Sequence, residues 1–159
     1  MIDMIHQLSW AQQLHGDIGT VWQFFSSPHN LARITPREMR FSVISDLPGV
    51  GIYEGAIIDY WVSPLFGIPI KWQTEITQVE AYKSFTDFQA KGPYRLWKHV
   101  HEFLPWKEGV LMKDTLEYEL PLGALGEVAH RWIVKKKILH IFDYRRGVLD
   151  DLFNKKGQG

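Results

Sequence analysis

The sequence predicts an α+β fold in which a curved antiparallel sheet of six to seven strands surrounds one long C-terminal helix. Two periodic patterns lead to this class. Across residues 41–120 apolar and polar residues mostly alternate, which is the period of strands with one buried face. Across residues 125–153 apolar residues recur every three or four positions, which is the period of an amphipathic helix. Because the strands must bury their apolar face and this helix is the only large partner, we expect the sheet to curve around it.

One strand and two short helices are expected before the main sheet region. Residues 4–14 alternate imperfectly and are interpreted as the first strand. Asp17 is a suitable N-cap for a first helix, which Pro28 ends. A second short helix is expected over residues 30–34, because Thr35 precedes Pro36 and the residue before a proline avoids the helical region.

Six further strands are expected between these helices and the terminal helix. Residues 110–120 are the best predicted strand, and residues 70–79 also alternate clearly, with Trp72 and Thr74 on one face. Lys71 and Gln73 share the other face. Turns rich in glycine or proline separate several of these segments. The predicted strands cover residues 41–44, 52–62, 70–79, 85–90, 94–104 and 110–120.

The C-terminal helix is expected to present one apolar stripe to the sheet. This stripe consists of Leu125, Val128, Ala129, Trp132, Leu139, Phe142, Leu149 and Phe153. The other faces carry basic side chains that we expect to be exposed, namely Arg131, Lys135, Lys136, Lys137, Arg145 and Arg146. Residues 1–154 are therefore predicted to form a single domain, followed by a flexible tail over residues 155–159.

Length and composition exclude several classes of protein. The 159 residues suffice for one domain, and the absence of cysteine excludes disulfides and thiolate metal sites. Basic (18) and acidic (18) residues balance, so no overall field attracts nucleic acid. The first ten residues lack the features of a secretory signal, and no uncharged stretch is long enough to span a bilayer. We expect a cytoplasmic protein with no nucleic-acid partner and no integral membrane association.

Several short segments carry a resemblance to a known superfamily. They are Phe25-Ser26-Ser27-Pro28 with Asn30-Leu31, Ile34-Thr35-Pro36, Gly92-Pro93-Tyr94 followed by Trp97, His99, His101 and Phe103, and residues 118–123. Together with the order of elements, they resemble the START-like, or SRPBCC, superfamily, in particular bacterial ligand-binding proteins of its polyketide cyclase/dehydrase-like branch. The resemblance covers nearly the whole chain and implies a helix-grip fold with an apolar cavity between sheet and helix. It implies no particular ligand and no shared set of catalytic residues.

A cluster of histidines and aromatic residues forms the most specific motif. Trp97, His99, His101 and Phe103 occupy alternate positions of one predicted strand, and Asp114 lies among apolar residues on the next. Two imidazoles and a carboxylate at inward positions suit a metal site, an acid–base pair or a hydrogen-bonded polar patch. The catalytic candidates are thus His99, His101 and Asp114. An H-x-H motif alone favours the polar patch, and we expect no bound metal and no cofactor.

Large aromatic residues are abundant, with seven Trp, six Tyr and nine Phe. Rings in this number either fill a wide interior or form the walls of a cavity. We interpret inward positions of the central strands and of the helix as ligand-binding. The candidates are Trp72, Thr74, Trp97, His99, His101, Phe103, Met112, Asp114, Tyr118 and Trp132.

Three functions are considered. The first is binding or transport of a small hydrophobic or amphipathic molecule between the sheet and the helix. The second is a cyclase, aromatase or dehydratase in which His99 or His101 acts as acid or base and Asp114 orients it. The third is a protein-interaction module, because residues 125–159 carry eight basic and four acidic residues. Phosphate-binding loops and G-x-S-x-G or H-E-x-x-H motifs are missing, so binding without catalysis is favoured.

Overall fold

A seven-stranded antiparallel sheet forms the body of the molecule. A computed structural model describes residues 4–46, 49 and 51–155. Along the sheet the strand order is β1-β7-β6-β5-β4-β3-β2, and every neighbouring pair is antiparallel. The strands are β1 (His6–His15), β2 (Ser42–Val43), β3 (Ile57–Val62), β4 (Ile70–Glu80), β5 (Ser84–Lys91), β6 (Leu96–Trp106) and β7 (Gly109–Glu119).

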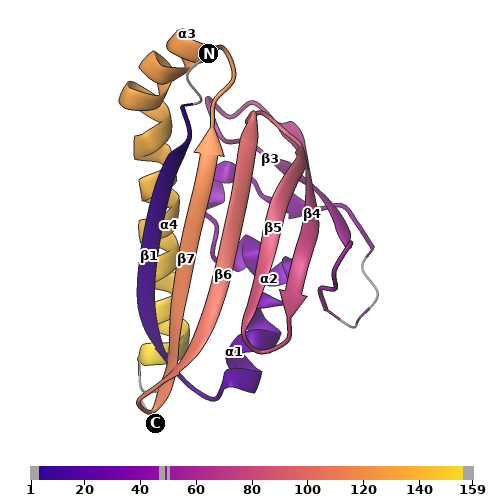
Figure 1. Cartoon of the computed structure of the whole chain (residues 1–159), viewed down its shortest axis with the longest axis vertical. Helices are drawn as coiled ribbons and strands as arrows, with labels where there is room; N and C mark the ends of the chain where they lie inside the picture. The colour runs from indigo at the N-terminus through magenta and orange to yellow at the C-terminus, as the bar shows by residue number, and fades with distance from the viewer. Residues whose placement is uncertain (1–3, 47–48, 50, 156–159) are drawn as a thin grey trace.

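Helices cover one face of this sheet. Figure 1 shows the long C-terminal helix running along β1 and β7, with α1 and α2 behind the same sheet nearer its lower end. The long helix is continuous through four segments, two of which are π-helical turns. The helical elements are α1 (Ile18–Phe25), α2 (Pro28–Arg33), η1 (Arg37–Met39), α3 (Gly123–Ala129), η2 (His130–Val134), α4 (Lys135–Leu149) and η3 (Asp150–Asn154), where η2 and η3 are the π-helical turns.

The predicted architecture is confirmed, with differences at element ends. Asp17 caps α1 by accepting a hydrogen bond from the Thr20 backbone N–H at 2.9 Å. Pro28 starts α2 instead of only ending α1, because a proline needs no N–H partner in the first helical turn. The strand predicted over residues 52–62 begins only at Ile57, and the one over residues 41–44 shortens to two residues. The predicted tail, except Lys155, lies outside the described residues.

The apolar stripe of the C-terminal helix was misplaced in its first half. Leu125, Val128 and Trp132 are 74%, 59% and 67% exposed. The buried positions are instead Gly126, His130, Val134, Ile138, Phe142, Arg145 and Leu149.

The physical reason for this shift lies in the turn geometry of the helix. Steps of four residues, as from Gly126 to Phe142, drift by about 40° each in a regular α-helix, and the wider π-helical turn η2 offsets that drift. Gly126 also allows a close approach, because a Cβ there would clash with the Pro121 carbonyl oxygen.

The helix packs on only part of the sheet. Val134, Ile138 and Phe142 form one hydrophobic cluster with Leu116 and Tyr118 of β7. Phe142 also stacks on Trp10 of β1, with ring centroids 3.6 Å apart, so the helix is held against β1 and β7. Within the described part of the chain, no helix combines the length and apolar character needed to cross a membrane.

Candidate functional site

A cavity of about 410 Å³ lies between the sheet, the C-terminal helix and α2. Its volume falls in the lower part of the range typical of small-molecule pockets. Most of its lining side chains are apolar, and they come from β3, β4, β5, β6 and the helices. Leu122 and Leu125 line the cavity, although their exposed fractions are 78% and 74%. The cavity therefore opens to solvent beside the start of α3.

Aromatic rings form one wall of the cavity. Trp97 of β6 meets Trp72 of β4 nearly edge-on, with centroids 5.4 Å apart, and Tyr94 at 4.7 Å. Trp72 in turn stacks against Tyr60 of β3 at 6.1 Å. Contacts of this kind hold large rings in fixed orientations, which makes a rigid apolar surface.

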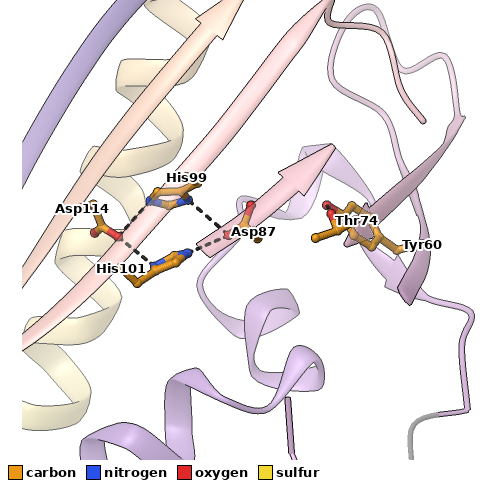
Figure 2. Close-up of polar contacts among 6 residues, drawn as sticks. All are labelled: Tyr60, Thr74, Asp87, His99, His101 and Asp114. Atoms are coloured by element: carbon orange, nitrogen blue, oxygen red, sulfur yellow. Dashed lines mark hydrogen bonds and ion pairs between the residues drawn. The ribbon is translucent and has the colours of Figure 1, made fainter. Parts of the chain in front are cut away.

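Four ionisable side chains form a closed network on the inner face of the sheet. In the strand register, Asp87 of β5 lies opposite His99 of β6, and Asp114 of β7 lies opposite His101 of β6. All four side chains therefore share one face. Each imidazole lies between both carboxylates, as Figure 2 shows.

The distances in this network are short and unequal. His99 Nε2 lies 2.9 Å from Asp114 Oδ1, and His101 Nε2 lies 2.7 Å from Asp87 Oδ2. His101 Nδ1 lies 3.0 Å from Asp114 Oδ1, at ion-pair distance but outside hydrogen-bond geometry. His99 Nδ1 is farther from Asp87 Oδ2, at 3.7 Å. Only Asp87 is appreciably exposed, at 20% of its side chain, while Asp114 is 2% exposed.

Burial and the two carboxylates act in opposite directions on the histidines. Burial disfavours a charged imidazole, but the contacts of His101 with Asp114 and Asp87 outweigh it and raise the pKa of His101 to about 9. Burial and the neighbouring charge of His101 lower the pKa of His99, and the hydrogen bond to Asp114 offsets this only in part. Although burial by itself raises a carboxyl pKa, the histidines hold the pKa of Asp114 and that of Asp87 below their usual range.

These shifts and distances assign the protons. His101 is doubly protonated: its Nε2–H donates to Asp87 Oδ2, and its Nδ1 lies at ion-pair distance from Asp114 Oδ1. His99 is neutral and donates its Nε2 proton to Asp114, which leaves a lone pair on Nδ1 facing Asp87.

One positive charge beside the network was missed by the sequence analysis. Arg145 of α4 lines the cavity and is only 8% exposed, although we expected it on the solvent face. Among the described residues its side chain has no hydrogen bond and no ion pair, and it lies over the Phe142 ring at 4.7 Å. Arg145 lies three residues after Phe142 and four residues before Leu149, and both of these are buried. This helical spacing could have identified Arg145 as a buried position.

Asp87 was also missed, although its position follows the alternation of β5. It lies two residues after Phe85, and both side chains line the cavity. Of the proposed ligand-binding residues, those lining the cavity are Trp72, Thr74, Trp97, His99 and His101.

The remaining candidates lie elsewhere. Phe103 and Met112 pack in the hydrophobic core with Trp22 of α1. Asp114 lies behind the two histidines, and Tyr118 is buried with its hydroxyl 2.7 Å from His130 Nε2. Trp132, expected on the inner stripe, is exposed because the helix turns His130 and Val134 inward instead.

Among the residues that the structure describes, two sets of side chains have potential ligand atoms close enough to hold a metal ion. The potential ligand atoms of Asp87, His99 and His101 lie within 4.8 Å of one another, as do those of a second set, His6, Glu127 and His130. In the first set the shortest contact is already a hydrogen bond between His101 and Asp87. A metal ion there would have to displace that proton, and we retain the expectation that none is bound.

Solved structures with the same architecture come from bacteria and plants. A START superfamily protein from Mycobacterium smegmatis is 12% identical with a TM-score of 0.68, covering 92% of this chain and 99% of that chain. Ginseng major latex-like protein 151 from Panax ginseng is 14% identical with a TM-score of 0.69, covering 96% and 99%. Protein CV1439 from Chromobacterium violaceum is 10% identical with a TM-score of 0.71, covering 94% and 98%. No protein-family model and no curated protein sequence matches the chain.

At these identities the likeness shows the fold. The chain has the helix-grip fold of START-like proteins, with a seven-stranded antiparallel sheet and a long C-terminal helix. The expected SRPBCC-like architecture is thereby confirmed.

Proposed function

We propose that this protein binds a small hydrophobic or amphipathic molecule in the cavity between the sheet and the C-terminal helix. The observation that carries the proposal is the cavity itself, an apolar space of about 410 Å³ that opens at Leu122 and Leu125. Each methylene group moved from water into such a space contributes about 0.8 kcal/mol, so a medium-sized apolar molecule needs few polar contacts.

The polar network supports a defined orientation of the bound molecule. Asp87, His99 and His101 supply polar groups to the lining of the cavity, whereas Trp72 and Trp97 belong to its aromatic wall. A molecule with one polar end therefore places that end towards the histidines and its apolar body along the rings. This arrangement agrees with pockets in which a few polar groups fix orientation and apolar walls supply affinity.

A cavity-filling substitution tests the proposal. Ile141 of α4 lines the cavity, whereas Ile133 of η2 is 38% exposed and lies outside it. We expect 1-decanol and 2-naphthalenemethanol to raise the melting temperature of the wild-type protein and to change its tryptophan fluorescence. Ile141→Trp should weaken their binding at least tenfold, and the matched control Ile133→Trp should not. Equal binding by both variants, or no binding to the wild type, would contradict the proposal.

A second candidate function is acid–base catalysis on the bound molecule. It is favoured by one observation: the His99 imidazole lines the cavity while its Nε2 lies 2.9 Å from Asp114 Oδ1, so Asp114 can orient the ring. Mass spectrometry of small molecules that co-purify with the wild type and with His99→Gln separates the two functions. Binding alone predicts the same molecule in both proteins. Catalysis predicts that an unreacted precursor accumulates on His99→Gln only.

A further inference from the structure

The polar atoms without partners at the cavity wall are hydrogen-bond donors. Among the described residues, the Trp72 indole N–H, the Arg145 Nε–H and His101 Nδ1 are buried without a hydrogen-bond partner, and all three side chains line the cavity. An indole N–H and a guanidinium have no acceptor capacity, so neither can satisfy the other. Leaving a buried donor unpaired is costly, and the cost is greater for a charged group. A partner for these donors has to supply hydrogen-bond acceptor atoms.

The charges around Arg145 do not remove this need. Asp87 and Asp114 act on the guanidinium through space, but both are in direct contact with His101 and neither forms an ion pair with Arg145. The Tyr60 hydroxyl also acts on the guanidinium through space, but its hydrogen-bond partner is Thr74, at 2.8 Å. Arg145 is held in place by the Phe142 ring. Its hydrogen-bonding edge is thus left for a group that enters the cavity.

We propose that the molecule bound in the cavity is an apolar carboxylic acid, whose carboxylate is bound by the Arg145 guanidinium. The inference rests on the proposed binding function and names its ligand class. A guanidinium matches a carboxylate with two parallel N–H···O bonds, and such charge-assisted bonds are about twice as strong as neutral ones. The Trp72 indole N–H is a further hydrogen-bond donor in the wall of the same cavity.

Charge balance is compatible with a bound anion. With His101 protonated and His99 neutral, the two carboxylates are balanced by His101 and Arg145. A ligand carboxylate adds one negative charge, and His99 can compensate it by taking up a proton. A hydrocarbon of the same size would leave the guanidinium without a partner, and an alcohol would offer one neutral acceptor oxygen in place of a charged pair.

Matched acid and alcohol probes test the ligand class. The pairs are decanoate with 1-decanol, and 2-naphthoate with 2-naphthalenemethanol, measured by titration calorimetry on the full chain. We expect the wild type to bind each acid at least tenfold more tightly than its alcohol. In Arg145→Met this preference should disappear, while the alcohol binds as before or more tightly. In the control Arg131→Met, which changes an exposed arginine outside the cavity, the preference should stay.

The outcomes separate this inference from the proposed function. If the alcohols bind as tightly as the acids to the wild type, the ligand class is wrong while cavity binding stands. If Arg145→Met keeps the preference for acids, Arg145 is not the carboxylate partner and the inference fails. If neither member of either pair binds, the proposed function fails as well. Should Arg145→Met not fold, Arg145→Lys replaces it, and it should reduce the preference without abolishing it because its ammonium lacks the planar fork.

Discussion

Two clusters of histidines and carboxylates occupy different regions of the same sheet. The cavity network consists of Asp87, His99, His101 and Asp114 on β5, β6 and β7. The sheet-end cluster consists of His6 of β1, Tyr118 of β7, Glu127 of α3 and His130 of η2. In the first, two imidazoles share two carboxylates. In the second, His6 contacts the Glu127 carboxylate and His130 contacts the Tyr118 hydroxyl.

Burial and partners set the charge of each cluster. The His99 and His101 side chains are 5% and 8% exposed, whereas those of His6 and Glu127 are 26% and 27% exposed. In the sheet-end cluster the His6 and His130 rings stack with centroids 3.7 Å apart. Burial, followed by the charge of His6, lowers the pKa of His130, so this histidine is held neutral.

The comparison shows that similar residues serve different purposes according to location. The sheet-end cluster joins β1 and β7 to the start of the C-terminal helix, through the His6–Glu127 contact at 2.8 Å and the Tyr118–His130 hydrogen bond. It therefore fastens the helix to the sheet. The cavity network holds fixed charges beside an apolar space, which is an arrangement suited to orienting a ligand.

Removing one carboxylate from each cluster should give the largest contrast. Asp114→Asn leaves the buried His101 charge without one of its two partners, and we expect a loss of about 3–5 kcal/mol in the free energy of unfolding. Glu127→Gln removes a half-exposed partner, and its loss should stay below about 1 kcal/mol. Urea denaturation of both variants measures the difference. Equal losses would show that burial does not distinguish the clusters.

The pH dependence of stability should sharpen the same contrast. The folded pKa of His101, about 9, lies above its unfolded value of about 6.5, so its stabilisation is complete below pH 6.5 and is lost as pH rises through 9. We expect the free energy of unfolding to fall by about 1–3 kcal/mol between pH 7 and 10. His101→Gln should show a flatter profile over this range. The exposed control His140→Gln should keep the wild-type slope, and a steep profile in His101→Gln would contradict the assignment.

A smaller effect is expected from a single hydroxyl of the sheet-end cluster. Tyr118→Phe removes the hydrogen bond to His130 and leaves the ring packed against the helix, at a cost of about 1 kcal/mol. Binding of 1-decanol should not change, because Tyr118 does not line the cavity. Thermal denaturation and the decanol titration provide the two measurements. A loss of binding would instead place Tyr118 in the site.

The smallest expected effect is that of chelation. Because the close donors of both clusters are already hydrogen-bonded to each other, we expect no stoichiometric transition metal in the purified protein. Chelation should then leave the melting temperature unchanged. Elemental analysis showing about one zinc or iron per chain, lost in His99→Ala, would overturn this expectation and favour the catalytic function.

The sequence alone was sufficient for the architecture and for part of the site. Alternation in residues 70–79 and 110–120 identified strands with one inward face, and the same rule placed His99 and His101 together on one side of β6. These predictions succeed because the period of a strand is a local property of the chain. Pairing between strands is not local, and so the sequence did not reveal that Asp87, although inward by the alternation of β5, lies opposite His99.

The tertiary structure decided which helical residues face the cavity. The sequence placed Trp132 inside and Arg145 outside, whereas the fold exposes Trp132 and buries Arg145. A π-helical turn at η2 and the close approach at Gly126 rotate the first half of the helix, and neither can be deduced from a regular period of 3.6 residues. The charge of Arg145 is a property of its side chain. Its lack of a partner depends on the sheet, the helix and the cavity together, because burial is a property of the packed molecule.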